Sequence, residues 1–481
     1  MATSTTGTSP TSSAPRLRRS LTLWDLILYG IIVIQPVAPM SVFGVLSDRG
    51  RGHVVTTILI AMVAMLFTAI SYGRMARAYP SAGSAFTFVG QEINPALGYV
   101  TGWSMVMDYI LNPMICIIWI SQQAHVFAPG IPYWAWAILF AVLFTGLNIQ
   151  GVKTSARVNS ALAALMGVVI AIFFVAAARY IFGHPRDEAG FFTRPFYDPQ
   201  LFDARAVLGG TSIAVLTYIG FDGISTLSEE AENPRRNILL ATVLTCLVIG
   251  ILSAVEVYAA QLLWPASEPF PNIDTAFTYV AGRAWPPLFA IIGFTLLVAN
   301  FGSGMGAQLG AARLLYGMGR SSALPKSFFG AVDARRHVPR NNVVFVGALA
   351  LAGAFFLPWV AAIPSVLVRF FGRGFGTLFG TAATGYDLGA NLLNFGALIA
   401  FMGVNVAAFV HYYLRAEERK LRNLLPPVLG FVICLLLWIG LSPLAWVFGV
   451  AWMSVGIAFG YWKTRGFRGS LIDFELPPEE E

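Results

Sequence analysis

The sequence predicts an all-α polytopic membrane protein with about 12 transmembrane helices. Three observations lead to this fold class. Hydrophobic residues make up 57% of the 481 residues, whereas charged residues make up 11%, which is too apolar for an ordinary soluble domain. Apolar segments of about 20 residues, the length that crosses a hydrocarbon core, recur along almost the whole chain. The basic residues gather in the short loops between these segments, as membrane topology requires.

We expect a single membrane domain over residues 21–463, with a Ser- and Thr-rich disordered tail at 1–20 and a second polar tail at 464–481. The last two of the expected helices, over about 427–462, are additional to the ten that precede them. The predicted spans cover residues 24–46, 54–72, 95–127, 133–149, 157–182, 206–228, 238–264, 286–317, 342–359, 386–413, 427–441 and 443–462.

The distribution of charge predicts the orientation in a plasma or inner membrane. If both termini are cytoplasmic, most of the 31 Lys and Arg residues lie on the cytoplasmic side. The net charge of +7 therefore reflects topology, and we expect the lipid bilayer rather than nucleic acid as a partner. Cys116, Cys246 and Cys434 fall in separate apolar spans and are expected to be packing residues, with no metal and no cofactor.

The first span contains a helix break at Ile34-Gln35-Pro36-Val37-Ala38-Pro39. Each proline lacks a backbone donor and clashes with the carbonyl four residues earlier, so a continuous helix is not expected here. A kink would be the ordinary reading for one proline. Two prolines three residues apart, together with Gln35, favour a true discontinuity.

The sixth span breaks at Gly220-Phe221-Asp222-Gly223, within the stretch 216–234, which we expect to form the centre of the site. An acid in the middle of an apolar helix is costly and is usually functional. Glycines loosen the helix and free its carbonyls, which is tolerated where the backbone lines a cavity.

Corresponding breaks in spans one and six predict an inverted repeat of five plus five helices, with repeats over about 24–182 and 206–413. The two broken helices of such a repeat meet near the midplane of the membrane. Their free carbonyls and half-helix ends then form the site for a substrate and a coupling ion.

Further polar groups lie within the apolar spans. Asp108 is a candidate site residue on span three, with a structural hydrogen bond to another helix as its alternative role. Asn300 and Ser303 lie on the Gly-rich span eight and are open either to helix packing or to ligand contact. The Gly-rich residues 360–385 are a poor spanning helix, so an external loop, an interfacial segment and a lid all remain open.

Motifs for enzymatic or ATP-driven chemistry are absent from the sequence. It contains no phosphate-binding loop, no metalloprotease motif and no nucleophile elbow, so an enzyme is not expected. A channel would more naturally show a pore helix and filter than paired breaks within one chain. Secondary transport is the function that these patterns favour.

The sequence resembles the amino acid–polyamine–organocation (APC) permeases across spans one to ten, most of all the bacterial putrescine importers. The stretches that carry the resemblance are LFTAISYG at 66–73, PSAGSAFTF at 80–88, GWSMVMDY at 102–109, GFDGISTLSEE at 220–230, RLLYGMGR at 313–320 and NFGALIAFMGVN at 394–405. This resemblance implies a LeuT-type fold, alternating access, and proton-coupled uptake or exchange of amino acids or amines.

Three departures from the family refine this expectation. The break in span one contains prolines where many amino-acid permeases have glycines whose amides hold a carboxylate, which favours an amine substrate. Met166 stands where some members carry a lysine on span five, so that proton switch is not supported. The segment 360–385 is longer than the usual connection.

We therefore predict an importer of a small, putrescine-like amine or an amino acid, with a proton as the coupling ion. The alternatives are an amino-acid permease or exchanger of the same fold and a transport-inactive sensor or partner subunit. Asp222 would bind an ammonium, Asp108 would bind a second ammonium or titrate, and Tyr218 and Phe221 would gate or stack. The predicted substrate-binding residues are Ile34, Gln35, Pro36, Val37, Asp108, Thr217, Tyr218, Gly220, Phe221, Asp222, Asn300 and Ser303.

Overall fold

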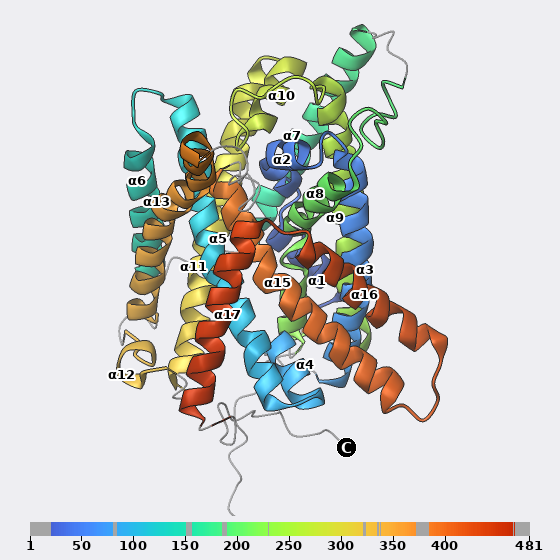
Figure 1. Ribbon diagram of the computed structural model, residues 1–481, viewed down its shortest axis with the longest axis vertical. Helices are drawn as coiled ribbons and strands as arrows, with labels where there is room; N and C mark the ends of the chain where they lie inside the picture. The colour runs from blue at the N-terminus through green and yellow to red at the C-terminus, as the bar shows by residue number, and fades with distance from the viewer. Residues whose placement is uncertain are drawn as a thin grey trace, which may run out of the picture.

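The computed structural model describes residues 21–79, 84–150, 156–184, 190–228, 230–320, 324–333, 336, 338–371, 384–464 and 466. Over these ranges the regular structure is helical, apart from an isolated β-bridge between Leu21 and Ala231. Most of the helices run along the long axis of the molecule (Figure 1). Helix α10 (Ala276–Ala284) marks one end of the bundle, and α4 (Ser84–Glu92) and α12 (Lys326–Phe329) mark the other.

The expected spans are confirmed as helices of the right length and composition. Among the described residues, 10 helices are long and apolar enough to cross a membrane, and the bent pair α1 (Leu23–Ile34) and α2 (Ala38–Arg49) adds an eleventh span. Helix α6 (Tyr133–Ile149) is a shorter apolar helix. The remaining long elements are α3 (Val54–Ala78), α5 (Pro95–Phe127), α7 (Ala156–Gly183), α8 (Ala204–Ala214), α9 (Pro234–Leu263), α11 (Pro287–Arg320), α13 (Arg340–Phe371), α15 (Gly385–Phe409), α16 (Leu421–Ile439) and α17 (Pro443–Lys463).

Helix α5 lies at the centre of the bundle and packs against α4, α6, α11, α13, α15 and α17. Almost its whole length is buried, and Trp119 on it is among the largest fully buried side chains. Helices α7, α16 and α17 are instead mostly exposed apolar surface. This distribution fits a protein whose outer helices face lipid, because lipid, unlike water, does not oppose apolar surface.

The structure differs from the predicted elements at two places. Residues 84–92, expected to be part of a loop, form α4, which packs against α5 and α15. Helix α13 continues twelve residues beyond the expected end at 359 and reaches Phe371, with Pro358 and Pro364 inside it. The Gly-rich segment 360–385 is therefore helical in its first half, and its residues 372–383 lie outside the described residues. The boundaries of the two repeats stay a prediction.

Candidate functional site

The first span breaks where its prolines predict. Helix α1 ends at Ile34, Gln35 has a φ of 68°, and α2 begins at Ala38 with a bend of 46° between the two helices. Pro36 has no N–H, so the carbonyl of Ile32 loses its usual helical donor. The backbone amides of Gln35 and Ala38 are already used, because they donate to the carbonyl oxygens of Ile31 and Gln35, each at 3.0 Å.

The sixth span breaks at the predicted glycine. After α8 the chain forms a short 3-10 helix, η1 (Val215–Tyr218), then turns at Gly220 and continues as a second one, η2 (Phe221–Leu227). Gly220 has a φ of 118°, which side chains rarely tolerate. A Cβ built on it would lie 3.0 Å from Cγ1 of Val33 and 3.4 Å from Cγ1 of Ile34. The two breaks therefore touch each other, and only glycine fits at the crossing.

Asp222 lies in the first turn of η2, directly at this crossing. Its side chain is buried, and the backbone amides of Gly220, Asp222 and Gly223 face its carboxylate. Within the part of the chain that the structure describes, no Lys or Arg forms an ion pair with Asp222. The amides favour an anionic carboxylate, and a cationic ligand could supply the counter-charge that the described protein residues do not.

Asp108 on α5 lies close enough to Asp222 for the two carboxyl groups to interact electrostatically. Both side chains are buried, at 9% and 7% exposure. Three tyrosines, Tyr29, Tyr72 and Tyr109, also lie within the field of Asp222. The structure thus brings the two predicted acids together and surrounds them with phenols.

An aromatic cluster forms one side of this acid pair. The ring of Tyr72 contacts those of Phe221 at 5.4 Å and Phe401 at 5.8 Å, both edge to face. Phe221 and Phe401 are 5.2 Å apart. The hydroxyl of Tyr72 is buried and, among the described residues, has no hydrogen-bond partner. Rings and a free hydroxyl beside two acids suit a ligand that is both cationic and partly apolar.

Helix α11 closes the opposite side. The Gln35 side chain donates to the carbonyl oxygen of Ala299 at 2.7 Å, and the Asn300 side chain donates to Oγ of Ser41 at 3.0 Å. Ser303 lies beside Cys116 of α5. Further along α11, Gly302 and Gly306 are exposed, and a Cβ on either would meet no atom within 4 Å.

Two predicted site residues donate hydrogen bonds to backbone carbonyls. The Thr217 hydroxyl donates to the carbonyl oxygen of Ala214 at 2.7 Å. The Tyr218 hydroxyl donates to the carbonyl oxygen of Ile58 at 2.9 Å and lies against Gly250, so it holds η1 against α3 and α9. Ile34, Pro36 and Val37 are buried at the first break, as expected for backbone-lining positions.

Other residues at the site were missed. Tyr72, Tyr109 and Phe401 lie inside stretches quoted for the resemblance, yet a Tyr or Phe in an apolar span carries no periodic signal of its own. Ser84 of α4 forms a hydrogen bond of 3.0 Å with Ser225 of η2. This contact shows that α4 packs against the second break. Glu229, which follows the second break, lies outside the described residues.

The end that carries α10 is closed by a separate set of contacts. The Trp119 indole donates to the carbonyl oxygens of Ser41 and Asp274, at 3.1 and 2.7 Å. Arg49 of α2 forms an ion pair with the buried Asp387 of α15. Because α2 is the far half of the first broken helix, these contacts fix that half against α5, α10 and α15.

Comparisons with known proteins agree with this architecture. The chain is 33% identical to the low-affinity putrescine importer of Escherichia coli K12 over 97% of its length and 98% of the relative. It is 24% identical to the methylthioribose transporter of Bacillus subtilis 168 over 93% of this chain and 94% of the relative. The crystal structure of the Eremococcus coleocola manganese transporter matches with a TM-score of 0.52 at 10% identity, covering 96% of this chain and 99% of that one.

The likeness to that transporter structure shows the fold and confirms the predicted LeuT-type arrangement with discontinuous helices one and six. The sequence pattern of the amino acid permease family matches residues 37–471, which include the whole second break and the second half of the first, from Val37 onwards. The chain therefore belongs to the amino acid permease family, as its resemblance to the APC permeases predicted.

Proposed function

We propose that this protein is a secondary active transporter that imports a small, putrescine-like amine by alternating access. The observation that carries the proposal is the Asp222 carboxylate, buried at the crossing of the two breaks and without a basic partner among the described residues. An ammonium beside it would form a charge-assisted hydrogen bond in a water-poor site. The putrescine importer of Escherichia coli, similar over nearly the full chain, supports this substrate class.

The second carboxyl supports an amine with two cationic ends. Asp108 interacts electrostatically with Asp222 from a different helix, so a diamine would meet an acid at each end. The Phe221, Tyr72 and Phe401 rings would cover the methylene chain between its ammonium groups. Each acid would then face a cation, which offsets the cost of burying two like charges together.

An amino acid is the second candidate substrate, and the first break makes it the weaker one. A substrate carboxylate would need amide donors there. Of the N–H groups around the two prolines, those of Gln35 and Ala38 already donate within the break. An amino-acid permease or exchanger of the same fold remains the alternative, because the family that the chain matches is the amino acid permease family.

We further propose that uptake is coupled to a proton and that the end of the bundle with α4 and α12 faces the cytoplasm, with both termini on that side. Two buried carboxyl groups that interact can bind a proton when the substrate is absent and release it when an ammonium arrives. The positive-inside rule supports the orientation. The contacts of Trp119 and Arg49 would then lie at the end of the bundle that faces outward.

The test is uptake of labelled putrescine by the purified protein in proteoliposomes, with unlabelled putrescine, arginine and leucine as competitors. We expect saturable uptake that putrescine displaces and that collapse of the proton gradient stops. Displacement by leucine but not by putrescine would establish the amino-acid alternative. Uptake driven by sodium instead would contradict proton coupling. Absence of saturable uptake of any compound in the panel would favour a sensor or partner subunit.

A further inference from the structure

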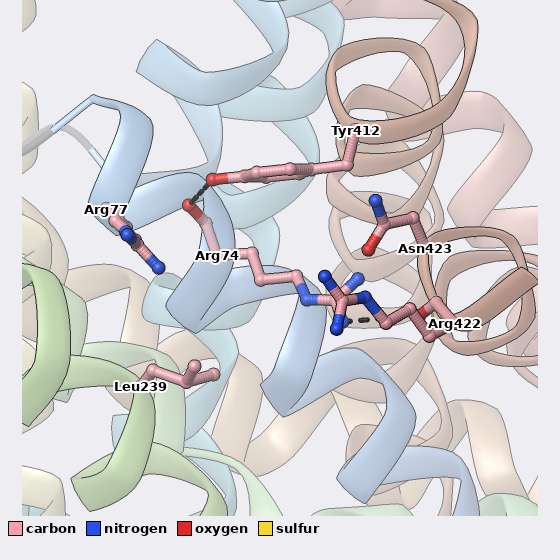
Figure 2. Close-up of a pocket in the computed structure, with 6 residues that line it drawn as sticks. All are labelled: Arg74, Arg77, Leu239, Tyr412, Arg422 and Asn423. Atoms are coloured by element: carbon pink, nitrogen blue, oxygen red, sulfur yellow. Dashed lines mark hydrogen bonds between the residues drawn. The ribbon is translucent and has the colours of Figure 1, made fainter. Parts of the chain in front are cut away.

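A second polar site lies away from the crossing of the broken helices, at the end of the bundle that carries α4. Here a pocket of about 520 Å³ opens between α3, the first turns of α9 and the start of α16 (Figure 2). Three of its lining residues are arginines; the guanidinium groups of Arg74 and Arg422 lie next to each other, and Arg77 lies farther away. The lining residues are Arg74, Arg77, Leu239, Tyr412, Arg422 and Asn423.

The positive charge of this pocket is not neutralised by the protein. Arg74 donates from Nη2 to the carbonyl oxygen of Arg422 at 3.3 Å, while its Nη1 is buried and has no hydrogen-bond partner among the described residues. In the same part of the chain no carboxylate forms an ion pair with Arg74, Arg77 or Arg422. Like charges that face each other without a counter-ion are costly, and an anion would remove that cost.

The nearby acids already have other partners. Glu92 of α4 accepts from Tyr79 at 2.8 Å and pairs with His411 and Arg415, at 2.7 and 2.9 Å. Glu418 pairs with Lys420. The anion that the three arginines could bind is therefore not one of these carboxylates. Guanidinium groups with several free N–H donors match the geometry of a phosphate especially well.

An apolar track leads into the pocket along α3. Ile60, Val63, Phe67, Ile70 and Arg74 follow one another at intervals of three and four residues, so they share one face of the helix. All five are partly or fully exposed, with Ile60 at 39% and Val63 at 42%. The track is about 21 Å long at 1.5 Å per residue, enough to span the roughly 15 Å hydrocarbon thickness of one leaflet.

Exposed apolar side chains also lie on the two helices that pack beside α3. On α9 they are Leu244, Val248, Ile251 and Val255, and on α16 they are Leu421, Leu425, Val428, Leu429, Val432 and Leu436. Both helices contact α3, and Leu239 of α9 lies in the pocket itself. The arginine pocket is thus the polar end of an apolar surface that faces the bilayer.

We propose that this pocket binds the phosphate of an anionic phospholipid, whose acyl chains lie along the α3 track. Arg74, Arg77 and Arg422 contact the phosphate, and Asn423 lies beside the glycerol region. A soluble phosphate shares the chemistry of the head group but would gain nothing from Ile60, Val63 and the other residues of the track. The bound lipid neutralises the positive charge between α3 and α16 and adds to the direct contacts of the two helices.

The experiment is lipid titration of the full-length, delipidated protein in neutral detergent, followed by native mass spectrometry. The probes are phosphatidylglycerol, phosphatidylcholine with matched acyl chains, and inorganic phosphate as a competitor. We expect phosphatidylglycerol to be retained in preference to phosphatidylcholine and not to be displaced by inorganic phosphate. Equal retention of the two lipids would overturn the proposal. Displacement by inorganic phosphate at matched concentration would overturn the lipid assignment and identify a free-anion site.

Matched variants localise the binding. Arg422 is exposed, so Arg422→Gln leaves the packing intact, and we expect it to weaken phosphatidylglycerol binding about tenfold. Arg74→Gln should weaken it at least as much. The control is Arg340→Gln, which removes an exposed arginine at the start of α13, outside the pocket. Unchanged binding in Arg422→Gln, or the same loss in Arg340→Gln, would show that the pocket is not the site.

Discussion

The Gln35 side chain and the backbone of Ala299 join the first break directly to α11, through a hydrogen bond of 2.7 Å from Nε2 to the carbonyl oxygen. Gln35 itself has a positive φ, so this bond holds a strained residue in place. The relationship explains why a polar side chain stands between an apolar helix and two prolines. It orients the break towards the helix that forms the opposite side of the site.

Replacing Gln35 by leucine should therefore weaken both stability and transport. The change removes the donor and leaves the Ala299 carbonyl without it, at a cost of about 1–3 kcal/mol. We expect a lower midpoint of thermal unfolding in detergent and reduced uptake. Gln200→Leu, at an exposed loop position, is the control. A variant with the parent's midpoint would show that the bond does not stabilise the break.

Gly220→Ala should disrupt the crossing of the two breaks. Alanine at this position would have to adopt a φ of 118°, which a residue with a Cβ rarely does. Its Cβ would also lie 3.0 Å from Cγ1 of Val33, so α1 and η2 would be pushed apart. We expect a loss of stability of about 1–3 kcal/mol and loss of uptake. Gly209→Ala is the matched control, because its nearest atom would be 3.8 Å away and alanine favours a helix. Equal behaviour of the two variants would contradict the close contact.

Asp222→Asn should separate substrate binding from folding. The amide is nearly isosteric but carries no charge, so an ammonium loses its charge-assisted hydrogen bond. We expect the affinity for putrescine to fall about tenfold to a hundredfold, with little change in the unfolding midpoint. Glu417→Gln, which removes an exposed carboxylate, controls for net charge. Parent-like uptake by Asp222→Asn would remove Asp222 from the proposed site.

The ion pair between Arg49 and Asp387 should be visible in a double-mutant cycle. Asp387 is fully buried and Arg49 is 21% exposed, so removing either partner leaves the other without its counter-charge. We expect Arg49→Met and Asp387→Asn each to lower the free energy of unfolding by roughly 1–3 kcal/mol. The double variant should lose less than the sum of the two losses. Strict additivity would show that the pair contributes nothing.

The buried carboxyl group of Asp274, next to α10, should make the free energy of unfolding depend on pH. Burial raises its pKa from 3.8 to about 7, although the Thr384 hydroxyl donates to the carboxylate. Between these two pH values the folded protein binds more protons at this group than the unfolded chain does. The free energy of unfolding should therefore fall as the pH rises through this window.

Thermal unfolding measured at intervals from pH 4 to pH 7 checks this prediction, with Asp274→Asn as the comparison. The variant has no carboxyl group to titrate, so its slope with pH should be smaller than that of the parent. Parallel slopes would assign the pH dependence to other groups.

The sequence predicted the positions of both breaks because prolines and a glycine pair leave few alternatives for the backbone. The length of the apolar segments predicted the spans, because only helices of about 20 apolar residues match the thickness of the hydrocarbon core. Residues whose importance comes from tertiary contacts were not predictable. That the Tyr218 hydroxyl donates to the carbonyl oxygen of Ile58, for example, depends on how α3 packs against η1, and the sequence does not show it.

The acid pair shows the same limit. Asp108 and Asp222 were each conspicuous as acids in apolar spans, but they are 114 residues apart in the chain and nothing in the spacing shows that they meet. The arginine pocket was missed for a related reason. Arg74 and Arg77 lie at the end of a predicted span, where basic residues are common, and Arg422 lines the same pocket only because α16 packs along α3.

The isolated bridge between Leu21 and Ala231 has a mechanical consequence. Leu21 donates to the carbonyl oxygen of Glu230 at 3.1 Å and accepts from the amide of Glu232 at 2.8 Å. These two bonds tie the start of α1 to the segment that follows η2, on the side opposite the crossing of the breaks. Because α1 and η2 are connected at both ends, they would move as one unit. A displacement of Leu21 would therefore tilt both half-helices together.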